Sequence, residues 1–145
     1  DIRSLVVDKG LSKVGSPDRV GENLYNRGVM NSVLIAEAIR TAQQKTGKQV
    51  VTAADVRLGL ENLDLTEARI EELGLKGFMP ALKVTCKDHS GAHAVYVQEW
   101  DGTSWRKATD WIEPMTDVVR PMLEQAAAEY VKANPGWPQR AEACG

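Results

Sequence analysis

NLYNRGVMNSVLIAEAIRTAQ, residues 23–43, is the stretch that decides the fold of this chain. Between residues 29 and 39 its strongly polar residues are only three: Asn31, Ser32 and Glu37. A helix that is apolar on nearly every face is typical of the interior of a larger protein. We therefore predict a helix that other elements cover on most of its sides.

The predicted helix begins at Gly21 or Asn23 and ends at Thr46, where Gly47 supplies the left-handed residue that closes many helices.

Length and composition allow a folded domain and exclude several classes of protein. The 145 residues suffice for a sizeable core. Hydrophobic residues make up 43% and charged residues 26%, and no apolar run is long enough to span a membrane. The 18 basic and 20 acidic residues are scattered, so we expect no nucleic-acid partner. The chain starts at Asp1 with what reads as the end of a helix, and we expect a fragment.

Three further helices are predicted. Residues 52–55, TAAD, resemble a capping box and predict a second helix that ends near Asn62. A short third helix is expected over 66–73. A last helix is expected over 114–132, with a proline at its start and apolar residues at intervals of three and four.

After the third helix, the spacing of apolar residues changes from that of a helix to that of a strand. Residues 94–100, AVYVQEW, are rich in strand formers, and residues 101–102, DG, favour a turn. We expect residues 104–107 to pair with the strand before this turn and so to form a hairpin. Because apolar side chains alternate onto both sides of the first strand, we expect both of its faces to be covered. A further short strand is expected over 84–86.

The two cysteines, Cys86 and Cys144, leave two interpretations open. We favour one disulfide in an oxidising compartment, and the alternative is a pair of buried free thiols. A zinc site made by Cys86, His89 and His93 with Asp88 is a third possibility, although its spacing matches no closed structural pattern. Zinc and a disulfide exclude each other because one sulfur cannot serve both.

The sequence shows no catalytic machinery. It has no glycine-rich phosphate-binding motif, and the adjacent Asp88, His89 and Ser90 cannot align as a triad. We predict no enzyme activity and no cofactor. Four carboxylates are expected on solvated helix faces: Glu61, Asp64, Glu71 and Glu72.

Tyr25, Asn26 and Arg27 form a polar group at the start of the long helix. The free amides of a helix start suit a carboxylate, and an arginine adds a bidentate contact. The three residues are therefore a candidate ligand site. The alternative is that Arg27 extends into solvent and Tyr25 caps the core.

Five motifs, in order along the chain, resemble a known family. They are YNRGV (25–29), AEAIRTAQ (36–43), VRLGLENL (56–63), LGLKGFMP (73–80) and VQEWDGTSW (97–105). Together they resemble the C-terminal part of a periplasmic solute-binding protein of the branched-chain amino acid (Leu/Ile/Val) ABC-transporter type, a type I periplasmic binding protein.

The resemblance implies an α/β fold of two lobes that close on a ligand. Residues 1–80 would be the incomplete helical part of the first lobe, and residues 81–113 the strands and hairpin of the second lobe. Residues 114–145 would form the C-terminal helix and tail. Because the helices of the first lobe would lack their sheet partners, the chain alone would expose apolar patches or associate with another chain that supplies the missing surface.

The function implied by the resemblance is substrate binding for an ABC uptake transporter in the periplasm, or tethered outside the membrane. The protein would capture an amino acid or another small, possibly aromatic, carboxylate and deliver it to an inner-membrane permease. Tyr25, Asn26 and Arg27 would line the cleft, and a Cys86–Cys144 disulfide fits an exported protein. The alternative is a ligand-sensing domain of a receptor or regulator with the same fold.

Overall fold

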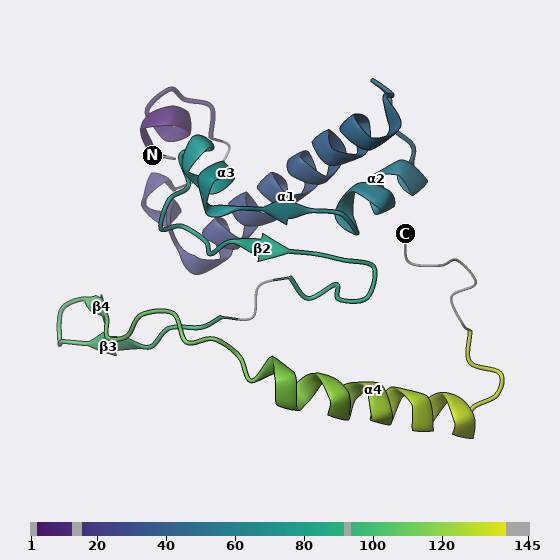
Figure 1. Cartoon of the computed structure of the whole chain (residues 1–145). Coiled ribbons are helices and arrows are strands. Elements are labelled where there is room, and N and C mark those ends of the chain that lie inside the picture. Colours follow the sequence, from purple (N-terminus) through teal and green to yellow (C-terminus); the bar gives the residue numbers. More distant parts are fainter. Residues whose placement is uncertain (1–2, 13–15, 92–93, 139–145) are drawn as a thin grey trace. The chain divides into compact units, whose positions relative to one another are not determined.

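The computed structural model describes residues 3–12, 16–91 and 94–138, and its contacts divide the chain into two compact units, residues 1–92 and 93–145. The first unit holds most of the helices, and the second holds a hairpin and one long helix (Figure 1). In chain order the elements are a π-helix (Arg3–Val7), a 3-10 helix (Pro17–Arg19), α1 (Asn23–Thr46), α2 (Ala53–Leu60), β1 (Asp64–Leu65), α3 (Glu67–Glu72), β2 (Leu82–Lys83), β3 (Gln98–Trp100), β4 (Trp105–Lys107) and α4 (Thr116–Ala133).

Helix α1 begins and ends where the sequence predicts. At its start the Asn26 side chain donates a hydrogen bond to the Gly21 carbonyl at 2.8 Å. At its end Gly47 adopts a φ of 70°, and its N–H donates to the Gln43 carbonyl. Most side chains disfavour this left-handed conformation, which explains why glycine closes the helix.

The capping box at the start of α2 is confirmed. The Thr52 hydroxyl accepts the Asp55 N–H at 3.3 Å, and the Asp55 carboxylate accepts the Thr52 N–H at 2.9 Å. Lys48 donates to the same carboxylate at 2.8 Å. The hydrogen bond from Lys48, followed by those from Thr52, lowers the pKa of Asp55 to about 2. This box fixes the position at which the chain turns from α1 into α2.

Helices α1 and α2 pack closely because small residues meet at their contact. Ala38 and Ala42 of α1 are completely buried. Gly59 of α2 lies against them, and a Cβ atom there would overlap the Ala38 carbonyl oxygen and lie 3.0 Å from the Ala42 Cβ. A side chain at residue 59 would therefore push the helices apart.

A small apolar core lies beneath α1. Strands β1 and β2 pair antiparallel, and the Val84 N–H donates to the Leu63 carbonyl at 2.9 Å. These bonds hold residues 82–84 in the first unit, so the unit extends past the predicted lobe boundary at residue 80. The buried core consists of Leu63, Leu65, Ile70 and Met79.

Within this unit α1 is covered on only part of its circumference. Its buried residues are Glu37, Ala38 and Ala42, whereas Leu24 is 71% exposed and Ile35 is 49% exposed. The apolar patches expected for the chain alone are therefore present. The reason is that α2, α3 and the β1–β2 pair contact only part of the helix circumference.

The second unit contains the predicted hairpin. Strands β3 and β4 pair antiparallel with Trp100 opposite Trp105, and the Asp101 carboxylate accepts the N–H groups of Thr103 and Ser104 at 2.8 Å each. Backbone bonds between Val95 and Ile112 extend the pairing. Among residues 94–138 none is buried, so the prediction that both faces of this strand are covered is wrong.

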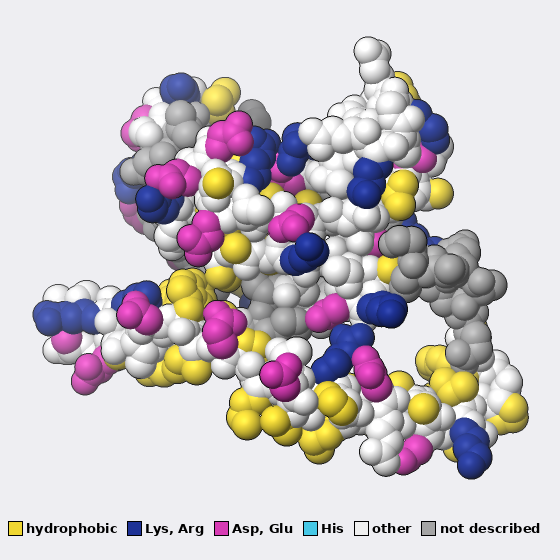
Figure 2. Space-filling model, viewed as in Figure 1, with side chains coloured by type: hydrophobic (Ala, Val, Ile, Leu, Met, Phe, Trp, Pro, Cys, Tyr) yellow, Lys and Arg dark blue, Asp and Glu magenta, His cyan; other side chains and the backbone are white. Residues whose placement is uncertain are grey.

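Helix α4 starts at Thr116, two positions after the predicted proline, and ends at Ala133. Its large apolar side chains are exposed except that of Val131, which is half-buried, and Figure 2 shows hydrophobic side chains along the helix. The Tyr130 ring meets the Trp137 ring edge to face at 5.2 Å. The helix thus has a regular backbone and lacks a buried side within the described part of its unit.

The described residues form helices and two antiparallel two-stranded sheets. The two-lobed α/β fold stays a prediction, since these sheets do not test it. Within the described ranges no helix is both long and apolar enough to cross a membrane.

Candidate functional site

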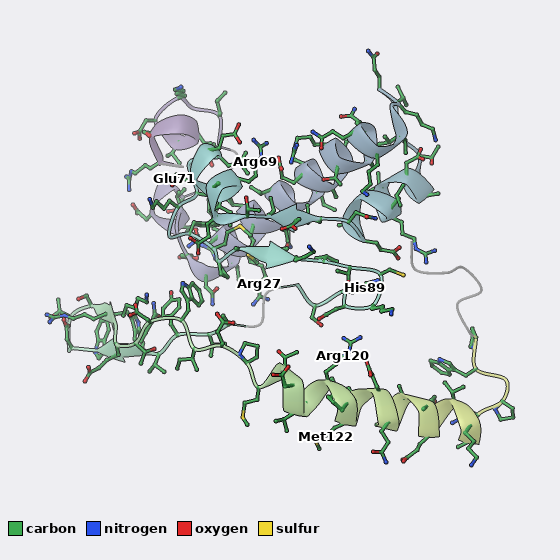
Figure 3. All side chains as sticks on the ribbon, viewed as in Figure 1. Arg27, Arg69, Glu71, His89, Arg120 and Met122 are labelled. Carbon is green, nitrogen blue, oxygen red and sulfur yellow. The ribbon has the colours of Figure 1, made fainter. Side chains whose placement is uncertain are left out.

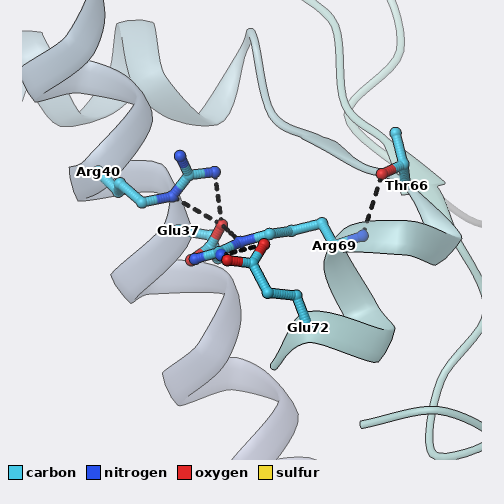
Figure 4. Close-up of polar contacts among 5 residues, drawn as sticks. All are labelled: Glu37, Arg40, Thr66, Arg69 and Glu72. Atoms are coloured by element: carbon cyan, nitrogen blue, oxygen red, sulfur yellow. Dashed lines mark hydrogen bonds and ion pairs between the residues drawn. The ribbon is translucent and has the colours of Figure 1, made fainter. Parts of the chain in front are cut away.

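A buried carboxylate, Glu37, accepts hydrogen bonds from two arginines in the first unit. Its side chain is 5% exposed. Arg69 reaches it from α3 and makes a two-pronged contact, with Nη2 2.7 Å from Oε1 and Nε 3.0 Å from Oε2. Arg40 donates to Oε2 at 2.7 and 2.9 Å, and Arg69 also meets Glu72 at 2.7 Å (Figure 4).

The ion pairs among Glu37, Arg40 and Arg69 keep these side chains ionised. The hydrogen bond from Arg69 is the main cause that lowers the pKa of Glu37 from 4.5 to about 2; burial opposes it, and Arg40 adds to the lowering. The hydrogen bond to Glu37 in turn raises the pKa of Arg69. A carboxylate held ionised in this way does not act as a general acid or base near neutral pH. The cluster therefore joins α1 to α3 and supplies no proton chemistry.

A cavity of about 490 Å³ opens beside the small core. Its volume lies in the range of small-molecule sites, and its walls are mostly apolar. Glu61 adds a polar edge: its Oε1 lies 3.0 Å from Arg57 Nε and 3.6 Å from His89 Nε2. His89 lies on the loop after β2 (Figure 3). The lining residues are Leu34, Arg57, Leu60, Glu61, Leu63, Leu82, Val84, His89, Ser90 and Gly91.

The cavity corrects one expectation about the carboxylates. Glu61 was expected on a solvated face, but its side chain is only 9% exposed because Arg57 and His89 lie over it. Asp64, Glu71 and Glu72 are exposed, as predicted. No local pattern indicates the burial of Glu61, since its covering loop is 28 residues away along the chain (61 to 89).

The structure does not bring Tyr25, Asn26 and Arg27 together at one binding surface. Tyr25 lines a shallow groove along α1 with small residues that include Gly28 and Ser32. The Asn26 amide is engaged with Gly21, and Arg27 is exposed. Consecutive helical residues project about 100° apart, which explains the separation. A ligand role for these three residues stays a prediction.

The structure tests the predictions for Cys86 but not those for Cys144 and His93. Cys86 is disulfide-bonded, so it is not available to a metal. Cys144 and His93 lie outside the described residues, and the Cys86–Cys144 pairing stays a prediction. Within the described ranges no three His, Cys, Asp or Glu side chains gather in a way that suits a metal ion.

The two arginine contacts of Glu37 differ in whether the sequence indicates them. The salt bridge between Glu37 and Arg40 has the i,i+3 spacing of helix neighbours and was detectable. The contact between Glu37 and Arg69 spans 32 residues, and no local pattern indicates it.

Comparisons with known proteins yield one solved structure. No protein-family model matches the sequence, and no curated protein matches it. The chain is similar to a crystal structure of an ABC transporter permease from the Pseudomonas fluorescens group, with 35% identity and a TM-score of 0.84. The similarity covers 97% of this chain and 34% of that one, so the chain spans about a third of its length.

This similarity corrects the family resemblance. The similar structure is of an ABC transporter permease, so the assignment to periplasmic solute-binding proteins, and the substrate-capture function with its sensing alternative, are wrong. The five motifs belong to packed helices and a hairpin turn, and such features do not determine what a protein does. What the similarity supports is an ABC-transporter context.

Proposed function

We propose that this chain is a segment of a longer ABC-transporter component of the permease kind. The observation that carries the proposal is the similarity over 97% of the chain to the Pseudomonas protein, at 35% identity and a TM-score of 0.84. A match of this length and quality concerns the whole chain rather than one helix or one turn. Transport by the complete protein is thus the activity to test.

The segment itself has a structural role in this proposal and is not an enzyme. The pKa falls to about 2 for two carboxylates, each in a charge pair: Glu37 of α1 pairs with Arg69 of α3, and Asp55 of α2 pairs with Lys48 in the loop after α1. Groups tuned for acid–base catalysis have a pKa near the working pH instead. The ion pairs support a scaffold that holds α1, α2 and α3 in place.

We also propose that the first unit faces an oxidising compartment. The disulfide at Cys86 supports this location, because reduced thiols prevail in the cytosol. A position in the periplasm or outside the cell satisfies this condition.

The test is purification of the tagged full-length parent from its own membranes, followed by measurement of ATP hydrolysis. An ABC transporter is expected to bring its ATP-binding subunit with it, so the purified complex hydrolyses ATP. The control is the same parent with the segment for residues 1–145 deleted, which should recover less of the ATP-binding subunit. Absence of any ATP-hydrolysing partner from the intact parent contradicts the proposal.

A further inference from the structure

Helix α4 presents an apolar face that nothing in the described part of its unit covers. Apolar residues recur along it at intervals of three and four, which places them on one side of a helix. Met122, near the middle, is 65% exposed, and Leu123 beside it is 60% exposed. The apolar face of α4 consists of Val118, Val119, Met122, Leu123, Ala126 and Tyr130, together with Met115 just before the helix.

The side of α4 opposite this face carries Asp117, Arg120 and Glu124, together with small residues and Val131. Figure 3 shows Arg120 and Met122 leaving the helix on different sides. Arg120 pairs with Glu124 across one turn at 2.9 Å. Three of the five charged residues of α4 thus lie opposite its apolar face, while Glu129 lies at the edge of that face beside Met122.

The charges of α4 favour a protein surface over a lipid surface as the occupant of this face. The helix carries three acidic residues and two basic residues. Helices that lie on membranes are typically rich in lysine and arginine, which attract anionic headgroups. The acidic balance of α4 provides no such attraction.

The length of the similar Pseudomonas protein indicates where a protein surface that covers the apolar face of α4 comes from. The similarity leaves unmatched only 3% of the 145 residues, about four, so most of the 18 residues of α4 lie within the matched part. The Pseudomonas chain is about three times longer than the matched part. In the Pseudomonas protein, most of the polypeptide therefore lies outside the part that matches this chain.

We propose that the apolar face of α4 packs against the remainder of a longer polypeptide that contains this chain. The covering surface is apolar and follows the helix for roughly 27 Å, at 1.5 Å for each of its 18 residues. This inference goes beyond the proposed function, because it holds for a longer parent whether or not that parent transports anything.

Two alanines of α4 provide a matched test. Ala126 lies within the apolar face, and Ala128 projects about 200° away from it. Both are exposed in the structure, so an aspartate at either position has room in the 145-residue chain. Ala126→Asp and Ala128→Asp should each be made in the 145-residue chain and in the full-length parent, with hydrogen–deuterium exchange of residues 116–133 as the readout.

The expected result is that α4 amides exchange at least about tenfold more slowly in the wild-type parent than in the 145-residue chain, because packing protects them. In the parent, Ala126→Asp should restore fast exchange, and Ala128→Asp should leave the protection within about twofold of wild type. In the 145-residue chain the two variants should behave alike.

Three outcomes would overturn the proposal. The first is equal exchange of wild-type α4 in parent and chain, a comparison that stands even if a variant fails to fold. The second is equal sensitivity of the parent to both substitutions. The third is a dimer of the 145-residue chain in analytical ultracentrifugation that Ala126→Asp dissociates while the parent is unaffected, which would assign the face to a second copy.

Discussion

Glu37→Gln is expected to lower the free energy of unfolding of the first unit by about 2 kcal/mol at pH 7. The substitution keeps the size of a side chain that is 5% exposed and removes the charge that Arg69 and Arg40 contact. The pKa of Glu37 falls from 4.5 to about 2. At about 1.36 kcal/mol for each pH unit this gives an upper value of roughly 3 kcal/mol. Solvent around the arginines screens the pairs, which reduces the expected value to about 2 kcal/mol.

The sign of the pH dependence follows from the lowered pKa. Because Glu37 binds its proton more weakly in the folded state than in the unfolded state, its contribution is complete above about pH 4.5 and is lost as the pH falls through about 2. Wild type and Glu37→Gln should therefore differ most at neutral pH and converge in acid.

The assay is urea denaturation followed by far-UV circular dichroism, at pH 7 and at pH 3. All four tryptophans lie in the second unit, so tryptophan fluorescence would miss the change. The matched control is Glu72→Gln, because Glu72 also pairs with Arg69 but its side chain is 69% exposed. This substitution should change the free energy of unfolding by less than about 1 kcal/mol. Equal effects of the two substitutions, or an effect of Glu37→Gln that does not shrink in acid, would refute the reasoning.

Three other changes test the packing and covalent structure. Gly59→Ala should lower the free energy of unfolding by about 1–3 kcal/mol in thermal denaturation, because its Cβ overlaps the Ala38 carbonyl oxygen. The matched control Gly28→Ala, which has open space, should raise stability by about 0.5–1 kcal/mol, and a gain at both sites would contradict the close helix contact. Thr52→Ala should cost about 1 kcal/mol in the same assay by removing the cap of α2, so an unchanged transition would count against the capping box. Thiol titration of the denatured, unreduced chain should find no free thiol at Cys86, and a reactive thiol there would exclude the disulfide.

Local signals predicted the helix boundaries well. Gly47 closes α1 and the Thr52–Asp55 box opens α2, and both act through backbone groups within four residues. The turn at Asp101 is equally local, since its carboxylate binds the next two free N–H groups. Features of this kind depend little on the rest of the protein.

Long-range contacts and surroundings were not predictable in this way. Arg69 lies 32 residues from Glu37, and the cover over Glu61 comes from the loop that holds His89. The apolar side chains of Tyr96, Trp100 and α4 indicated burial, but burial depends on partners outside the unit. The same limit explains the wrong family assignment, because packing motifs do not report what a protein carries or binds.

The central claim is that this chain is a segment of a longer ABC-transporter component, and one measurement addresses it most directly. An antibody against residues 23–46 should precipitate the native protein from solubilised membranes, for gel analysis and an assay of ATP hydrolysis. The account predicts a polypeptide about three times the 15.9 kDa of this chain, together with ATP hydrolysis in the precipitate. A 15.9 kDa polypeptide without ATP hydrolysis would contradict it.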